Sequence, residues 1–321
     1  MSIIPSTFNE HQIQQTVLGG TEPIPNIKLP VAVILLNTGT GGLYRTKLIE
    51  RLIKNGFSSI VSIDKTAENY NVEDFARMFP CVRFVVPHEN VSIGDMINIG
   101  MAELEEDYVL VINDSIHVGS SMLSGNVLDR YIAEENLCVV PRLVDAQRQP
   151  LPVRFTPMVE SNTLKPISSS LISERIPTLY PFDFVGIYNR QRFVKLGGYD
   201  YTITSPYWQN LDFSVRSWLW GESIVMSPLF QLAYDDSVPV EDSTPDKSQL
   251  RFYLKNCAPK FSADRCYIPI SRFFSYKKQS GRSFADARRD FKVARNWVEK
   301  NRYNFTKDIY MLIDSWGKNQ G

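Results

Sequence analysis

Apolar runs of strand length alternate with amphipathic segments over residues 29–141. The run over 30–37 (PVAVILLN) has no polar alternation, which is typical of a strand covered on both faces of a parallel sheet. The segment that follows it, 44–57, has apolar residues at helical spacing and a glycine, Gly56, placed to end a helix. This pattern predicts a strand, a glycine-containing turn and a helix as the first structural unit.

The same unit is repeated along the chain. Further strands are predicted over 58–64, 82–87, 108–114 and 137–141. Helices are predicted between or beside them over 72–79, 92–106 and 121–135. Strands separated by single helices imply right-handed crossovers, so we expect an α/β protein with a mostly parallel central sheet flanked by helices.

Composition changes divide the chain into regions. Residues 1–28 are polar and rich in glycine and proline, so they predict a loosely ordered leader before a main domain over 29–240. Within that domain, 142–181 is rich in proline and serine and predicts a long insertion that orders as a lid on the acceptor side. Residues 241–321 predict a helical C-terminal extension, with helices over 248–257, 283–301 and 306–316.

Between the insertion and the extension, regular structure is expected again. Strands are predicted over 183–189, 223–228 and 230–236, and helices over 190–197 and 208–221.

Composition excludes some classes of partner and location. The 321 residues include 35 Lys or Arg and 35 Asp or Glu, so we expect no nucleic-acid partner. The four cysteines form no CxxC pair and are expected to be buried, reduced thiols. The chain has neither a secretory signal pattern nor an apolar run of the ~20 residues that span a bilayer. The expected location is the cytoplasm, with peripheral association at the inner face of a membrane as the variant.

Polar side chains follow three of the predicted strands where each strand ends. Asn37 and Thr38 follow the first strand, Asp64 ends the second, and Asn113, Asp114 and Ser115 end the fourth. Ligands of open α/β sheets bind at the carboxyl ends of the strands, where such groups hold a ribose, a base or a hard cation. Asp and Asn are also common turn residues and helix N-caps, which is the alternative interpretation of each position taken alone.

With these motifs in place, Val31 to Ser237, about two-thirds of the chain, resembles a family-2 glycosyltransferase of the GT-A type. The motifs that carry the resemblance are VILLNTG, SIVSID, the Gly94, Asn98 and Gly100 helix start, VLVINDS, GGYD (197–200) and WQNLDFSVR (208–216). Asn113 and Ser115 occupy the positions where the family carries the two aspartates of its Asp-x-Asp motif, and Asn210 stands where it often has the first helix aspartate.

The resemblance implies a GT-A nucleotide-diphospho-sugar transferase fold and a set of site residues. Residues expected to contact the nucleotide sugar are Asn37, Thr38, Asp64, Asn98, Asn113 and Asp114. A divalent Mg²⁺ or Mn²⁺ is expected at Asp114, Ser115, Asp235 and Asp236. Residues expected on the acceptor side are Asp200, Trp208 and Asn210.

Asp212 is the candidate catalytic base, because transfer with inversion requires a carboxylate that removes the proton of the acceptor hydroxyl. Its alternative role is a stabilising i,i+4 ion pair with Arg216.

The implied activity is transfer of a sugar from a nucleoside-diphosphate sugar to a glycan or another hydroxyl acceptor, with inversion, in glycan or polysaccharide biosynthesis. Two alternatives stay open. The first is a catalytically inactive binding or scaffold protein that keeps the fold. The second is a nucleotidyltransferase, because NTGTGGLYRTK (37–47) offers glycines and a basic pair after the first strand.

Overall fold

The computed structural model describes residue 8 and residues 10–39, 42–65, 72–119, 123–160 and 163–316. Most of the first nine positions of the predicted leader, and Thr40 and Gly41 of the glycine-containing turn, lie outside the described residues. None of the described helices combines the length and apolarity needed to cross a membrane.

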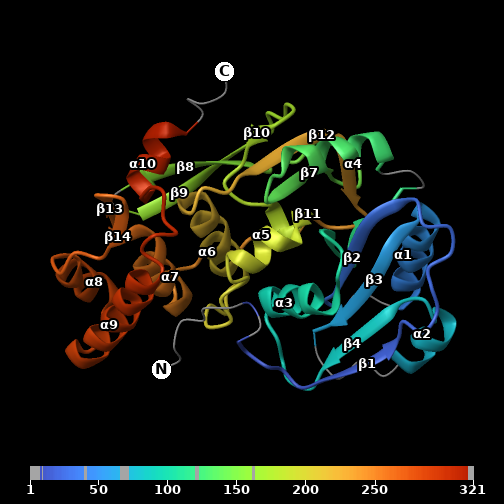
Figure 1. Cartoon of the computed structure of the whole chain (residues 1–321), viewed down its shortest axis with the longest axis horizontal. Coiled ribbons are helices and arrows are strands. Elements are labelled where there is room, and N and C mark those ends of the chain that lie inside the picture. Colours follow the sequence, from blue (N-terminus) through green and yellow to red (C-terminus); the bar gives the residue numbers. More distant parts are fainter. Residues whose placement is uncertain are drawn as a thin grey trace.

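A ten-stranded sheet forms the centre of the molecule (Figure 1), and its strand order is β1-β4-β3-β2-β5-β11-β7-β12-β10. The tenth strand, β6, pairs with β12. Its strands are β1 (Gln15–Gly19), β2 (Leu29–Asn37), β3 (Phe57–Asp64), β4 (Arg83–Pro87), β5 (Tyr108–Asn113), β6 (Ile116–His117), β7 (Cys138–Val144), β10 (Ile176–Pro177), β11 (Gly186–Asn189) and β12 (Ile224–Tyr234). The pairings give β2, β3, β4, β5, β7 and β12 one direction, whereas β1, β6, β10 and β11 run against them. The sheet is therefore mostly parallel.

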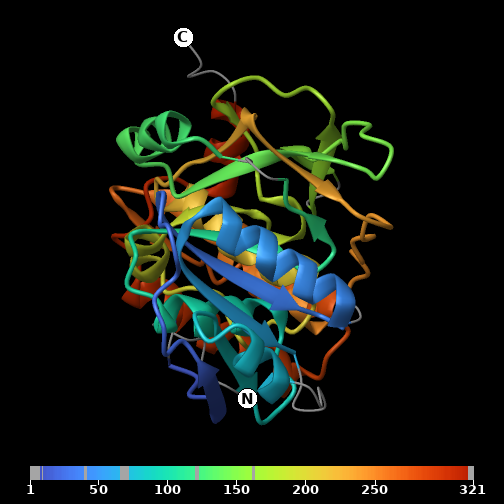
Figure 2. The ribbon, with the colours of Figure 1, turned by 90° about the vertical axis from the view of Figure 1, so that its right-hand side faces the viewer.

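Helices cover both faces of this sheet. Those of the main domain are α1 (Gly42–Asn55), α2 (Val72–Met78), α3 (Ile93–Glu103), α4 (Gly125–Glu134), α5 (Arg190–Lys195) and α6 (Pro206–Leu219). Helices α1 and α2 lie on one face of the first four strands and α3 on the other, with α6 packed beside α3 (Figures 1 and 2). The parallel strands are buried on both faces, which explains why their sequences lack polar alternation.

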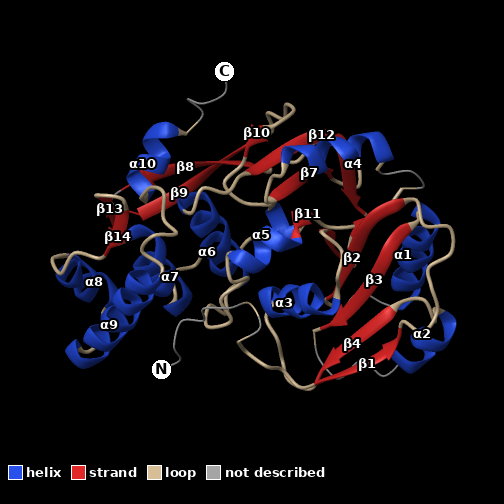
Figure 3. Cartoon of the chain, in the orientation of Figure 1, coloured by secondary structure: helices blue, strands red, loops and turns tan. Residues whose placement is uncertain are grey.

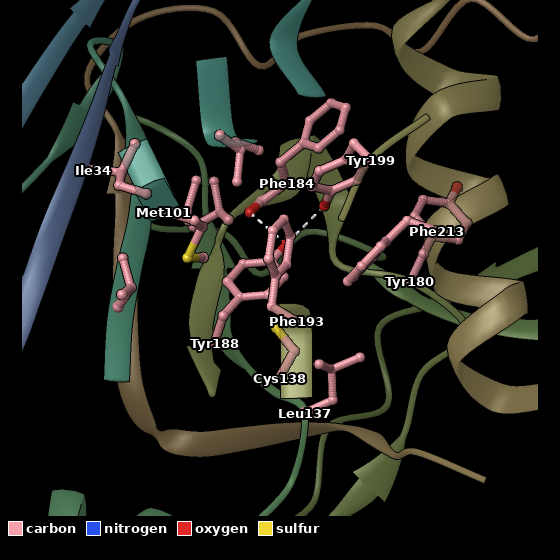
Figure 4. Packing of buried hydrophobic residues seen from close by; sticks show 14 of the residues in the cluster. Ile34, Met101, Leu137, Cys138, Tyr180, Phe184, Tyr188, Phe193, Tyr199 and Phe213 are labelled. Carbon is pink, nitrogen blue, oxygen red and sulfur yellow. Dashed lines mark hydrogen bonds between the residues drawn. The ribbon is translucent and has the colours of Figure 1, made fainter. Parts of the chain in front are cut away.

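An aromatic core lies between the second half of the sheet and α5 and α6 (Figure 4). The ring of Phe184 lies 5.4 Å from that of Tyr199, and Phe213 packs 4.5 Å from Tyr199 on the other side. The Tyr188 hydroxyl donates to the carbonyl of Phe184 at 2.9 Å and lies 3.3 Å from the Tyr199 hydroxyl. These contacts join the strand β11 to the GGYD turn and to α6.

The C-terminal extension confirms the predicted helical character (Figure 3). It contains α7 (Lys247–Phe252), which continues as a π-helix over Tyr253–Cys257, then α8 (Arg272–Ser280), α9 (Phe284–Lys300) and α10 (Ile309–Ser315). It also contains a small hairpin of β13 (Lys260–Ser262) and β14 (Arg265–Tyr267), which the sequence pattern did not predict.

Two predicted irregular regions contain regular structure. In the leader, Gln15–Gly19 forms β1, an antiparallel edge strand on β4. In the insertion, β8 (Arg154–Glu160) and β9 (Thr163–Ser169) form a hairpin that packs near α10, and β10 joins the main sheet. The chain at 223–236, predicted as two strands, is one strand with an irregularity between Ser227 and Gln231.

Candidate functional site

The strand ends singled out in the sequence lie side by side in the sheet. Asn37 is in register with Asp64 across β2 and β3, and Leu36 is in register with Asn113 across β2 and β5. The parallel strands thus bring Asn37, Asp64 and Asn113 to one edge, as their positions in the sequence predict.

Asp64 is fully buried beneath that edge and holds an arginine from α1. Arg45 donates to both carboxylate oxygens, at 2.9 and 3.0 Å, and to the Ser62 hydroxyl at 2.8 Å. The amide of Asn37 also donates to Asp64. The Arg45 guanidinium lies over the ring of Phe75. The predicted nucleotide contact of Asp64 stays a prediction.

Asp114 fixes the turn that follows β2. Its carboxylate accepts from the Thr38 backbone at 3.1 Å, the Thr38 hydroxyl at 3.0 Å and the Gly39 backbone at 3.3 Å. These contacts join Thr38 and Asp114, both of which the sequence predicts to bind the nucleotide sugar.

Asn113 contacts a carboxylate that the sequence analysis did not single out, Asp183. The Asn113 amide and the Tyr234 hydroxyl both donate to Asp183, the latter at 3.0 Å. The side-chain oxygen of Asn113 (Oδ1) accepts from the backbone N–H and the hydroxyl of Ser115. Burial, with a smaller effect from the charge of Asp114, raises the pKa of Asp183 to about 6.

A third carboxyl group, Glu241, completes what we call the carboxyl cluster (Asp114, Asp183 and Glu241). The Tyr180 hydroxyl donates to Glu241 at 2.7 Å. Burial, and then the charge of Asp183, raise the pKa of Glu241 to about 7. Two half-buried carboxyl groups therefore titrate close to neutral pH, which is characteristic of acid–base sites.

The predicted metal residues meet only in part. The backbone of Asp235 donates to the carbonyl of Ser115 at 3.0 Å, because β6 pairs with β12. The Asp235 side chain instead binds the His117 ring at 2.7 Å, and Asp236 is exposed. Across the described part of the chain, no group of three or more His, Cys, Asp or Glu side chains is arranged to hold a metal ion. As placed, these residues do not form a preassembled cation site.

The predicted base, Asp212, lies in a fully buried ion network. Its carboxylate is 2.7 Å from the ammonium of Lys255, 2.8 Å from the amide of Asn256 and 3.6 Å from Arg216. The predicted acceptor-side residue Asp200 is buried as well and lies 2.9 Å from the same ammonium. This network favours a structural role for both carboxylates, and the base role of Asp212 stays a prediction.

The other residues of this region fasten α6 and the GGYD turn to their neighbours. Asn98 on α3 exchanges two hydrogen bonds of 2.9 Å with the backbone of Tyr199. The indole of Trp208 donates to the Thr244 carbonyl at 3.0 Å, and the amide of Asn210 donates to the Pro181 carbonyl at 2.7 Å. Asn98, Trp208 and Asn210 are therefore buried supports of the site region, and their predicted ligand contacts stay predictions.

Close approach of α3 to this turn depends on Gly94. A Cβ atom at Gly94 would lie 2.6 Å from the Cβ of Tyr199 and 2.5 Å from the amide carbon of Gln209. Close packing of α3 against Tyr199 and Gln209 therefore explains why Gly94, part of a motif noted in the sequence, carries no side chain.

Sequence reasoning missed Arg45 as a partner of Asp64, and missed Asp183 and Glu241 entirely. Asp183 sits within the apolar stretch YPFDFVGIY, and Glu241 lies in the acidic stretch VPVEDSTPD. A charged residue inside an apolar run is the signal that could have identified Asp183.

Comparison with known proteins places the fold. No family model and no curated protein matches the chain in sequence. The structure of GalNAc-T7 with UDP, GalNAc and Mn²⁺ aligns with a TM-score of 0.54 at 13% identity, covering 84% of this chain and 56% of that one. Structures of S. aureus TarS align with a TM-score of 0.48 at 13–14% identity, covering 70% of this chain. For full-length TarS the alignment covers 40% of that chain, and for its 1–349 fragment with UDP-GlcNAc it covers 65%.

The chain spans just over half of GalNAc-T7, and at this identity the likeness concerns the fold. It confirms the expected GT-A fold, with a mostly parallel sheet between helices and a helical C-terminal extension. The assignment to family 2 stays a prediction.

Proposed function

We propose that the protein is a glycosyltransferase that moves a sugar from a nucleoside-diphosphate sugar to a hydroxyl acceptor. The carboxyl cluster carries this proposal. It lies at the carboxyl ends of the strands in a GT-A fold, where open α/β sheets bind ligands, and two of its members titrate near neutral pH.

The chemistry requires a base on the acceptor side. In an inverting transfer the acceptor oxygen forms a bond to the anomeric carbon, the bond from that carbon to the diphosphate breaks, and the hydroxyl proton passes to a carboxylate. Asp183 and Glu241 fit this role better than Asp212, since they are half-buried rather than enclosed in an ion pair. A growing glycan or polysaccharide is the acceptor class that we propose.

A divalent cation would neutralise the leaving diphosphate. Because the described residues form no preassembled cation site, no step of the proposal depends on a metal. The same observation favours the second candidate, a catalytically inactive protein that binds nucleotide sugars through the retained fold. A nucleotidyltransferase is the least favoured, and part of its candidate loop, 40–41, lies outside the described residues.

Nucleotide binding is the first test. We expect titration calorimetry to detect binding of UDP or GDP, and Mn²⁺ to strengthen it. Asp114→Asn should weaken binding at least about tenfold, because the neutral amide loses charge-assisted hydrogen bonds to Thr38 and Gly39. Asp129→Asn, on the exposed side of α4, is the matched control. Absence of binding by the wild-type protein to either nucleotide, with or without Mn²⁺, would contradict the proposal.

The base is identified by comparing three variants once a donor is known. We expect Asp183→Asn or Glu241→Gln to reduce turnover by about 10²–10⁴-fold with little change in donor affinity. Asp212→Asn should instead act mainly on the melting temperature, through the loss of its pair with Lys255. If only Asp212→Asn abolishes transfer in a stably folded protein, Asp212 is the base and the carboxyl cluster is not.

A further inference from the structure

An apolar surface with a basic border lies on the C-terminal extension, and none of the carboxyl-cluster residues lines its groove. We call it the extension patch, and it consists of the exposed Tyr267, Ile270, Phe274 and Phe284 and the half-buried Phe273, with the buried side chains of Ile268 and Phe291 lining the groove between them. Phe274, Ile270 and Phe284 are 71%, 66% and 59% exposed. Large apolar side chains that gather on a surface mark an interaction site, whereas scattered ones do not.

The members of the extension patch form one continuous surface. The ring of Phe273 lies 5.7 Å from Phe274, 5.4 Å from Phe284 and 5.5 Å from Phe291. Ile270 joins them, because it lines the same groove as Phe273 and Phe284. A groove of about 580 Å³ runs between Tyr267, Ile270, Phe273, Phe284 and Phe291.

Basic side chains border this groove. Arg288, Lys292 and Arg295 line it from α9, at a spacing that places them on one helix face with Phe284 and Phe291. All three are exposed, and none has an acidic partner among the described residues. The one acidic residue of the described lining, Glu299, is paired with Arg302. Over residues 265–300 there are ten Lys or Arg and three Asp or Glu, a net charge of +7 in a chain whose total charge is zero.

The position of the patch suits a docking surface. Figure 1 places α8 and α9 at the end of the molecule opposite to α1 and α2. A large flat partner could therefore contact α8 and α9 without contacting the central sheet. Exposed aromatic and aliphatic groups beside unpaired cations have the chemistry of helices that lie in the interface of an anionic bilayer. A protein partner would need a matching acidic border, and a second copy of this chain would place like charges against each other.

We propose that the extension patch docks the protein on an anionic lipid bilayer. The exposed apolar side chains enter the headgroup region, and Arg288, Lys292 and Arg295 contact lipid phosphates. This proposal does not depend on the proposed enzymatic function.

Co-sedimentation of the full chain with vesicles tests the proposal. We expect binding to vesicles of phosphatidylglycerol and phosphatidylcholine in equal parts, little binding to pure phosphatidylcholine, and loss of binding as salt is raised. Each basic residue near an anionic surface contributes about fivefold to affinity. Arg288→Gln/Lys292→Gln/Arg295→Gln should therefore weaken binding at least tenfold, as should Phe274→Asp/Ile270→Asp.

Matched controls separate the patch from general charge and apolarity. Lys47→Gln/Lys54→Gln/Arg77→Gln removes three exposed cations from α1 and α2, and Met78→Asp changes an apolar side chain that is 59% exposed. Both should bind the anionic vesicles like the wild type. Wild-type protein that fails to sediment with anionic vesicles at low salt overturns the proposal. So does a wild-type dimer that Phe274→Asp converts to a monomer without any change in sedimentation with vesicles.

Discussion

Two neighbouring residues, Asp183 and Phe184, adopt left-handed backbone angles, with φ of 52° and 63°. This conformation costs roughly 1–2 kcal/mol for each residue that carries a Cβ atom. Hydrogen bonds from Asn113 and Tyr234 hold Asp183, and the aromatic core holds Phe184. Such strain accumulates at functional sites, which agrees with the role proposed for Asp183.

The ionisation of Asp183 should make stability depend on pH. Because its folded-state pKa, about 6, lies above its ordinary value of 3.8, the favourable contribution is complete below about pH 4 and is lost as pH rises through about 6. In Asp183→Asn the side chain stays neutral, so its stability relative to the wild type should increase between about pH 4 and pH 8 by up to about 3 kcal/mol. Urea unfolding at several pH values measures this difference. A difference that is constant with pH would mean that Asp183 titrates as an exposed carboxylate.

Among the structural elements, the π-helix over Tyr253–Cys257 connects the extension to the main domain. It places Lys255, which is 1% exposed, between the carboxylates of Asp200 in the GGYD turn and Asp212 in α6. The ammonium group also lies 5.0 Å from the ring centre of Trp297 on α9. One cation therefore joins three separate elements.

Removal of this cation should destabilise the protein strongly. Lys255→Met leaves two buried carboxylates without their shared partner, and we expect a loss of about 3–5 kcal/mol in the free energy of unfolding. Adding Asp212→Asn to this variant should recover part of the loss, because one uncompensated charge is removed. Lys260→Met, at an exposed lysine of β13, is the control. Equal stabilities for Lys255→Met and the control would contradict this account.

The sequence predicted the elements with strong periodicity and missed those without it. The buried strands β2, β3 and β5 were expected within one residue, because their apolar runs admit one interpretation. The edge strand β1 was missed since QTVLG is polar at its start and half-exposed, and its partner β4 is about 70 residues away. The β8–β9 hairpin was not predicted because it contains prolines at 157 and 166, which are typical of loops. Both strands of a two-stranded sheet are edge strands, where proline is tolerated.

The candidate site was less predictable than the fold. Strand ends placed Asn37, Asp64 and Asn113 correctly at one edge, because register follows from parallel pairing. Pairings across long distances in sequence, such as Asn113 with Asp183 or Asp212 with Lys255, leave no local pattern. The pairing of Asp64 with Arg45 and of Asp212 with Lys255 was therefore not foreseen, whereas the ion pair of Asp212 with Arg216 was the alternative that the sequence offered.

On the scale of the whole molecule, the extension is part of the core and not an added module. Trp220 stacks with Trp297 on α9 at 6.2 Å, and Trp218 meets Trp316 after α10 at 4.9 Å. The β8–β9 hairpin also packs near α10. The helices after residue 240 therefore pack closely on the main domain, and the boundary near residue 240 stays a prediction.

Truncation tests this view. A chain that ends at residue 246 exposes the indoles of Trp218 and Trp220 and removes the partner of Asp200 and Asp212. We expect it to aggregate or to lose its near-ultraviolet circular dichroism while keeping helical far-ultraviolet signal. A truncated chain that is monomeric and melts cooperatively near the wild-type temperature would show that 29–240 folds independently.

The shared cation at Lys255 also has an evolutionary consequence. Replacing Lys255 alone leaves two carboxylates sealed in the interior without their cation, whereas replacing Asp200 or Asp212 alone leaves the cation with one carboxylate. A path that starts at Lys255 therefore passes through a poorly folded intermediate. Lys255 should therefore be exchanged only after an acidic position has become neutral. In descendants that have lost the extension, Asp200 and Asp212 should have become neutral before the loss. The order of these changes among related sequences would show whether an ancestor carried the extension.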